Sequence, residues 1–201
     1  MKDIVVACAL EDEFDRSVLE DLSSDIRFSF LPVGIGKVNS AVSLMHFLRK
    51  CAPQVVINVG TAGTFQHHVG DIVCANRYID RDIFAGNFSL VGHRLDDTLI
   101  RTELLPKSIL SGKPVDSREF LVSTGDNFMT EMREEEYVCD AVDMESYAMA
   151  FVCQKYRIPF FSVKYISDVV GQNSQKHWED KLKDARIALG HFMKSLDYSV
   201  F

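Results

Sequence analysis

The stretch that decides the fold is VVINVGTAG, residues 55–63. It begins as an apolar run rich in β-branched residues and ends in small residues from Gly60 onward. A short run that is apolar at successive positions is typical of a strand covered on both faces of a sheet. The small residues 60–63 predict either a tight turn or a place where a ligand approaches the backbone closely. The stretch therefore predicts a buried strand that ends beside a candidate ligand site.

Segments of two kinds surround this strand. Other short, mostly apolar runs predict strands at residues 4–9, 71–75, 120–124 and 160–166. Apolar residues spaced by three and four predict helices near residues 38–48, 142–152 and 182–196. Strands that alternate with helices are typical of an α/β fold. We therefore predict a single α/β domain over residues 1–201, with a central mixed, largely parallel sheet flanked by helices.

The charge balance favours a small-molecule partner. The 201 residues carry 22 basic and 29 acidic side chains, a formal net charge of −7. A nucleic-acid partner needs a basic surface that neutralises phosphates, so the acidic balance disfavours one. No apolar run approaches the roughly 20 residues that span a bilayer, and the first residues lack a signal-peptide pattern. We expect neither a nucleic-acid nor a membrane partner.

The cysteines indicate a reducing compartment. They are odd in number, widely spaced and without a C-x-x-C pair: Cys8, Cys51, Cys74, Cys139 and Cys153. We therefore expect small buried thiols in a cytoplasmic protein. The histidines show no metal-ligand spacing with Cys or Asp, and we predict neither a metal nor a cofactor.

Polar side chains follow the predicted strands. Residues 11–13 follow the first strand, residues 60–63 the second, residues 125–127 the fourth, and Ser167 and Asp168 the fifth. In parallel α/β sheets, ligands bind at the carboxyl ends of the strands. These clusters are therefore expected to converge on one pocket.

Each carboxylate also has a purely structural explanation. The acidic residues 11–13 can favour a helix N-terminus through its dipole, and Asp168 or Glu145 can cap the segment that follows it. A carboxylate on a mostly apolar helix face, however, needs a partner or a function. The neighbours of Glu145 on such a face are Ala148, Met149 and Val152. An aspartate in a desolvated pocket has a raised pKa and, when protonated, can donate to a leaving group.

Spacing excludes several other sites. Residues 60–63 do not fit a P-loop, and Gly34-Ile35-Gly36 is too short for a dinucleotide fingerprint and predicts a turn. No G-x-S-x-G motif of a serine hydrolase occurs. The pair His67 and His68 is interpreted as part of a surface loop, and Trp178 as a core residue.

Taken together, the motifs resemble the nucleoside phosphorylase and nucleosidase superfamily, and most of all the methylthioadenosine/S-adenosylhomocysteine nucleosidases. They lie in collinear order at residues 9–13, 34–39, 57–63, 69–73, 123–128, 141–145 and 158–169. The resemblance implies the fold of that superfamily and cleavage of the N-glycosidic bond of a purine nucleoside. It implies an adenine-type, 5′-modified nucleoside as the substrate, and a homodimer.

The resemblance implies catalytic roles for two carboxyl groups. Glu13 would position and activate the attacking water, and Asp168, with Ser167 beside it, would protonate the purine at N7. Glycosidic cleavage passes through an oxocarbenium-like state, so it needs one group of each kind.

The resemblance also implies a set of substrate-binding residues. Glu145 would bind the ribose hydroxyls while Met144 packs against the sugar. Phe128 would stack on the base, and Thr61 stands near the anomeric centre, where the family often has serine.

Three departures from the family pattern leave the 5′ group open. Lys164 stands where an arginine is common, and the segments 25–33 and 82–96 are shorter than usual. The substrate could therefore be methylthioadenosine, S-adenosylhomocysteine, 5′-deoxyadenosine or futalosine.

Two other functions stay open. Phosphorolysis would need phosphate near the sugar, where Lys37 or Arg77 could hold it, although the acids at 11–13 would repel it. A nucleoside-binding protein without activity could use the same fold.

Overall fold

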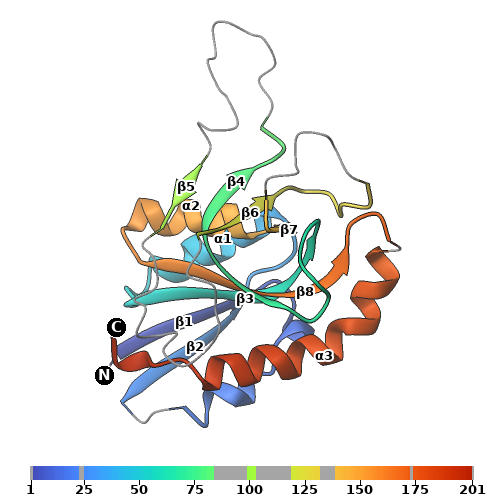
Figure 1. The fold of residues 1–201 in the computed structure, drawn as a ribbon. Helices are drawn as coiled ribbons and strands as arrows, with labels where there is room; N and C mark the ends of the chain where they lie inside the picture. The colour runs from blue at the N-terminus through green and yellow to red at the C-terminus, as the bar shows by residue number, and fades with distance from the viewer. Residues whose placement is uncertain are drawn as a thin grey trace, which may run out of the picture.

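The computed structural model describes residues 2–22, 25–83, 99–102, 119–131, 139–172 and 174–200 (Figure 1). The strands in these ranges are β1 (Lys2–Cys8), β2 (Ile26–Pro32), β3 (Val55–Thr64), β4 (Ile72–Asp80), β5 (Ile100–Arg101), β6 (Phe120–Thr124), β7 (Ala141–Asp143) and β8 (Phe160–Val169). The α-helices are α1 (Lys37–Leu48), α2 (Ser146–Tyr156) and α3 (Ser174–Lys194).

Five of the strands close into a ring. β3 pairs with β8 and β7, β4 pairs with β8 and β6, and β6 pairs with β7. The β3–β7, β4–β5 and β4–β8 pairs are antiparallel, and the other pairs are parallel. The predicted mixed, largely parallel sheet is confirmed. Its closure was not predicted, because the apolar pattern of a strand does not identify the neighbours of that strand.

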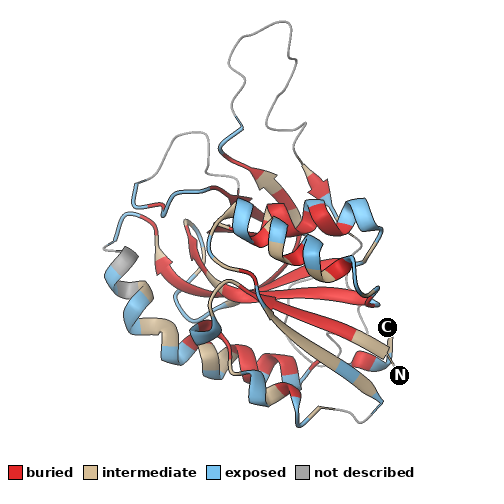
Figure 2. Ribbon diagram, turned by 180° about the vertical axis from the view of Figure 1, so that it is seen from behind, coloured by how far each residue is buried: buried red, intermediate tan, exposed pale blue. Residues whose placement is uncertain are grey.

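Helices cover both faces of the sheet. α1 and α2 pack against each other on one side, and α3 lies on the other side against β8 and β3 (Figure 1). Buried residues fill most of the strands and the inner faces of the helices, whereas the edge strand β2 is only partly buried (Figure 2). One core cluster lies under α1 and α2 and includes Leu44 and Met149, and a second lies under α3 and includes Ile57 and Leu189.

Two strands extend beyond their apolar residues. β3 continues through residues 60–63, so of the two alternatives for these residues the tight turn is wrong. β8 includes Ser167 and Asp168 instead of ending before them. The register between the two strands shifts at Ala62–Gly63, where β8 carries Ser167 as an extra residue. A β-bulge of this kind redirects side chains, and Ser167 and Asp168 are both buried.

The start of α2 also differs from the prediction. Residues 141–143 form β7, so the helix begins at Ser146 rather than near Val142. Val142 pairs with Gly63 of β3, a tertiary contact that local spacing does not reveal. β2, which no pattern predicted, pairs in parallel with β1 at the edge of the sheet. The segment 82–96, predicted to be shortened, lies largely outside the described residues.

Helix α1 turns its apolar stripe outward. Its buried residues are Ser40, Leu44 and Leu48. Val38, Val42 and Met45, spaced as one helical face, are instead 73%, 54% and 41% exposed. The helix was predicted correctly, but an amphipathic helix usually turns such a stripe to the core.

Other residues follow the sequence interpretation in part. Cys51 is half-buried and the other cysteines are buried, all as free thiols. His68 is exposed, whereas His67 is half-buried, and its ring nitrogen lies 3.1 Å from Asp140 Oδ1. The interpretation of the two histidines as a surface loop pair is therefore wrong for His67. None of the helices described is long and apolar enough to span a bilayer.

Candidate active site

The predicted polar clusters converge on a cavity of about 330 Å³. All the predicted site residues line it: Glu13, Thr61, Phe128, Met144, Glu145, Ser167 and Asp168. The volume lies in the range of small-molecule sites. β1, β3 and β8 run parallel and bring their carboxyl ends to the cavity, as expected. β7 runs antiparallel to β3, so it is the closure of the ring that brings Met144 and Glu145 there.

Glu13 is a buried carboxylate surrounded by donors. It lies in a short 3-10 turn after β1 and is 5% exposed. Its Oε1 accepts hydrogen bonds from the Thr61 hydroxyl and from the Thr61 N–H at 3.1 Å, and its Oε2 accepts one from the Leu10 N–H at 3.3 Å. Glu11 and Asp12 are exposed, whereas Glu13, which caps the turn through Leu10, is also buried and directed to Thr61.

Glu145 is held by the turn before α1. The Gly36 N–H donates to Glu145 Oε1 at 2.9 Å. Gly36 has a φ of 89°, a conformation that favours glycine, and the chain bends at residues 35–36, within the predicted turn. Glu145 precedes α2, but its side chain does not cap the helix. The role of cap belongs to Asp143, which accepts a hydrogen bond from the Ser146 N–H at 3.0 Å.

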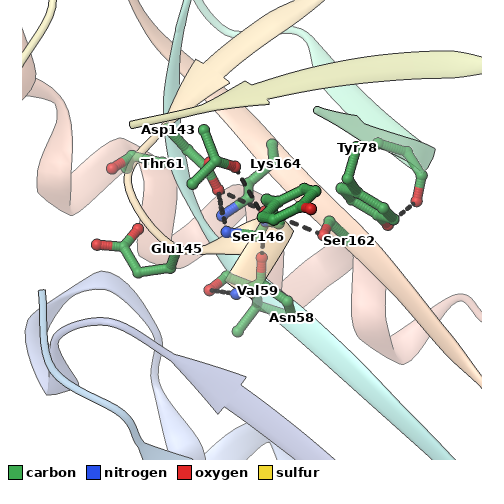
Figure 3. A network of polar contacts seen from close by, with 12 residues as sticks. Asn58, Val59, Thr61, Tyr78, Asp143, Glu145, Ser146, Ser162 and Lys164 are labelled. Atoms are coloured by element: carbon green, nitrogen blue, oxygen red, sulfur yellow. Dashed lines mark hydrogen bonds and ion pairs between the residues drawn. The ribbon is translucent and has the colours of Figure 1, made fainter. Parts of the chain in front are cut away.

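Lys164 and Asp143 form a buried ion pair near Glu145 (Figure 3). Lys164 Nζ is 2.9 Å from Asp143 Oδ2, and both side chains are buried. The Thr124 hydroxyl donates to Asp143 Oδ1 at 2.6 Å, and the Ser146 hydroxyl also contacts this carboxylate. Burial disfavours the charge of Lys164, but the Asp143 and Glu145 carboxylates raise the pKa of the ammonium group above its usual value. Lys164 is therefore a buried cation beside the cavity.

The surroundings of Glu145 disfavour its ionised form. Burial, and then the negative charge of Asp143, raise the pKa of Glu145 to about 7, although Lys164 and the Gly36 N–H act in the opposite direction. In Figure 3 the Glu145 carboxyl group points away from the Asp143–Lys164 pair. The group can therefore change its protonation state near neutral pH.

Asp168 lies inside β8, which argues against the alternative that it caps a following segment. Ser167 Oγ lies 2.7 Å from Asp168 Oδ1 and 3.3 Å from the Ala62 carbonyl oxygen. A Cβ at position 63 would come within 3.1 Å of Asp168 Oδ2 and of Val142 Cγ2. Glycine at this position therefore leaves the space that Asp168 occupies.

Phe128 is 41% exposed at the cavity, and the segment that carries it is fixed by Arg81. The Arg81 guanidinium donates to backbone carbonyl oxygens of four residues: Ser123, Gly125, Asn127 and Asp143. Sequence reasoning missed Arg81, because one arginine after a strand gives no signal of what its side chain binds.

Trp178 is the second residue that sequence reasoning missed. The prediction that it belongs to the core is wrong, because it is half-buried on α3 and lines the cavity. Its indole N–H donates to Thr61 Oγ1 at 2.8 Å, and its ring meets Phe128 edge-on with centroids 6.5 Å apart. A tryptophan that is partly buried needs an acceptor for its N–H, which is the signal that could have found it.

Comparison with known proteins identifies the family of the chain. The sequence model of the phosphorylase superfamily matches residues 30–197. The chain belongs to the phosphorylase superfamily. The resemblance seen in the motifs is confirmed.

Within the phosphorylase superfamily, the chain is similar to named nucleosidases. It is 33% identical over 180 residues to the 5′-methylthioadenosine/S-adenosylhomocysteine nucleosidase of Bacillus cereus strain B4264, covering 81% of this chain and 77% of that protein. The nucleosidase of the same name from Bacillus thuringiensis strain Al Hakam is 32% identical with the same coverage.

Two solved structures from Helicobacter pylori share the fold of this chain. A Helicobacter pylori 5′-methylthioadenosine/S-adenosylhomocysteine nucleosidase with butyl-thio-DADMe-Immucillin-A has a TM-score of 0.81 and 21% identity, with 97% of both chains covered. The native futalosine hydrolase of H. pylori strain 26695 has a TM-score of 0.79 and 20% identity, with 96% of both chains covered.

Proposed function

We propose that the chain hydrolyses the N-glycosidic bond of an adenine-type purine nucleoside with a modified 5′ position, releasing the base and a ribose derivative. The observation that carries this proposal is the meeting of Glu13, Glu145 and Asp168 at one cavity. Hydrolysis needs one group that protonates the leaving base, another that delivers water, and negative charge near the oxocarbenium-like sugar. The names of the similar nucleosidases support the same reaction.

In this proposal Glu13 and Asp168 are the catalytic residues. Glu13 holds the attacking water, since the surrounding donors fix the direction of its carboxylate. Asp168, protonated, donates to the purine at N7. Ser167 suits both states of Asp168, because its hydroxyl can donate to the aspartate or, when the aspartic acid donates to Ser167 Oγ, to the Ala62 carbonyl.

The other residues bind the substrate. Glu145 in its ionised form accepts hydrogen bonds from the ribose hydroxyls, and Met144 packs against the sugar. Phe128 stacks on the base, and Thr61 lies near the anomeric carbon. The proposed mechanism uses no metal and no cofactor.

The charges at the cavity favour hydrolysis over phosphorolysis. The described lining carries four carboxyl groups: Glu13, Asp143, Glu145 and Asp168. Arg81 is the one basic side chain among these lining residues, and its guanidinium is bound to backbone carbonyls. Phosphate would meet repulsion from the carboxylates without a free cation to balance it.

The two cations considered for phosphate lie elsewhere. Lys37 Nζ is 2.7 Å from Asp80 and 2.8 Å from Asp82, and Arg77 Nε is 3.7 Å from Glu119. Neither cation lines the described cavity.

A product assay tests the proposed reaction. Methylthioadenosine, S-adenosylhomocysteine, 5′-deoxyadenosine, futalosine and adenosine are each incubated with the protein, with and without phosphate, and both products are identified by mass spectrometry. We expect a free base and a free ribose derivative without phosphate. A sugar 1-phosphate that forms only with phosphate would show a phosphorylase. Binding of nucleosides without any base release would show an inert binding protein.

We also propose that the chain forms a homodimer through the apolar stripe of α1. Val38, Val42 and Met45 form an exposed face. Ile35 is 46% exposed and lines the cavity, so it continues this face as far as the cavity. Such a surface is typical of a protein interface. A second copy that covers this face would lie next to the mouth of the cavity.

The remaining expectations belong to the same proposal. Free thiols at all the cysteines suit a reducing cytoplasm. Residues 1–201 form one domain in this proposal, since all the described strands belong to one sheet.

A further inference from the structure

We propose that Trp178 is a positioning residue that acts on Glu13 through the hydroxyl of Thr61. The proposal rests on the function proposed for Glu13 and adds a residue to that site. Its basis is a continuous chain of hydrogen bonds from the indole N–H to Thr61 Oγ1, and from Thr61 to Glu13 Oε1.

The chemistry of the three groups fixes the direction of this relay. An indole N–H can only donate, and an ionised carboxylate can only accept. Thr61 has one hydroxyl hydrogen, and because its oxygen already accepts from Trp178, that hydrogen goes to Glu13 Oε1. The Thr61 N–H donates to the same oxygen at 3.1 Å. Donation from Trp178 therefore commits the Thr61 hydroxyl hydrogen to the same Glu13 oxygen that accepts the Thr61 N–H.

The relay joins elements that are distant in the chain. Thr61 lies on β3, Trp178 on α3, and Glu13 in the 3-10 turn after β1. α3 packs against both β3 and that turn. Hydrogen bonds in such a chain polarise one another, so each strengthens the next. The position of α3 is thereby coupled to the direction in which Glu13 presents its carboxylate to water.

The first test needs no turnover, so it is independent of the proposed activity. Trp178 is the only tryptophan in the chain, and its indole therefore gives one ¹⁵N–¹H signal in an NMR spectrum. We expect Thr61→Val to move this signal upfield and to speed its exchange with water, because the acceptor is lost. Glu13→Gln should move it by a smaller amount through Thr61. Glu179→Gln, an exposed position on the same helix, is the matched control. An indole signal that Thr61→Val leaves in place would overturn the relay.

The second test measures kinetics on the substrate that the product assay identifies. Trp178→Phe keeps an aromatic wall but removes the N–H, and we expect kcat to fall about fivefold with a smaller change in KM, as for the loss of one hydrogen bond. In a protein that already carries Thr61→Val, Trp178→Phe should have no further effect on kcat, because the relay is already broken. Equal reductions in both backgrounds would mean that Trp178 contributes packing alone. Thermal unfolding of each variant shows whether it is folded.

Discussion

At the residue scale, the site depends on how buried charges are balanced. Lys164 neutralises Asp143 through a direct contact of 2.9 Å, whereas Glu145 has the Gly36 N–H and no cation in direct contact among the described residues. Burial, and then the negative charge of Asp143, raise the pKa of Glu145 to about 7, since Lys164 and the Gly36 N–H only partly offset them. A carboxyl group that ionises near neutral pH can bind ribose hydroxyls as an acceptor, but the protein is less stable when that group is charged and the cavity is empty.

Glu145→Gln should therefore stabilise the unliganded protein above neutral pH. The folded state raises the pKa from 4.5 to about 7, so the stability associated with the protonated form is present below pH 4.5 and lost as the pH rises through 7. A neutral glutamine avoids that loss, which is on the order of 3 kcal/mol or less. The measurement is denaturant unfolding of both proteins at about pH 5 and about pH 8.

The comparison between the two pH values decides this prediction. The advantage of the variant should be larger at the higher pH, and the exposed Glu11→Gln should show none. An advantage that is the same at both pH values would contradict the proposed cause.

Asp168→Asn should remove the general acid and leave the fold intact. Asparagine has a similar shape but cannot supply the proton, so base release from substrates with a poor leaving group should fall by roughly 10²–10⁴-fold. A substrate whose leaving group needs no proton should be affected much less. Turnover of both substrate classes is measured alongside thermal unfolding. Unchanged turnover of the poor-leaving-group substrate would show that another group protonates the base.

At the scale of elements, one bulge and one arginine shape the cavity wall. The extra residue in β8 brings Ser167 and Asp168 to buried positions at the cavity. Arg81, just after β4, fixes the segment that carries Phe128 by donating to its backbone carbonyls. That guanidinium packs directly over Gly125, where a Cβ would lie 2.6 Å from Arg81 Nε.

Gly125→Ala should displace Arg81 and loosen the Phe128 segment. We expect a loss of stability of about 1–3 kcal/mol, as for overpacking, and a raised KM. Denaturant unfolding and steady-state kinetics measure the two effects. In an Arg81→Ala background the clash is absent, so adding Gly125→Ala there should have little further effect. An equally large additional loss in that background would mean that the backbone at Gly125, and not Arg81, is the cause.

At the scale of the whole molecule, closure of the ring and the outward stripe of α1 have separate consequences. Closure brings β7 against the carboxyl end of β3, and with it Met144 and Glu145 to the same cavity as Glu13 and Asp168. The stripe of α1 leaves apolar area at the surface on the side of the sheet away from α3 (Figure 1).

Val42→Glu should dissociate the proposed homodimer. A charge in the middle of the apolar stripe cannot be buried without a partner, so the dimer should weaken by several kcal/mol. Sedimentation velocity over a range of concentrations measures the change. Ile187→Glu, at an exposed apolar position of α3, is the matched control and should leave the mass unchanged. A monomeric wild-type protein at all concentrations would contradict the proposed dimer.

The sequence by itself determined the α/β class, most of the strands and most of the polar residues at the cavity. β-branched runs and helical spacing are local properties, and the motifs were specific because they occurred in one order along the chain. Only the tertiary structure decided that β3 passes through residues 60–63, that β8 bulges at Ser167 and that α1 turns its apolar stripe outward. It also decided that Arg81 and Trp178 belong to the cavity wall. The physical reason is that strand pairing, burial and hydrogen-bond acceptors depend on neighbours far away in the chain, which local patterns do not encode.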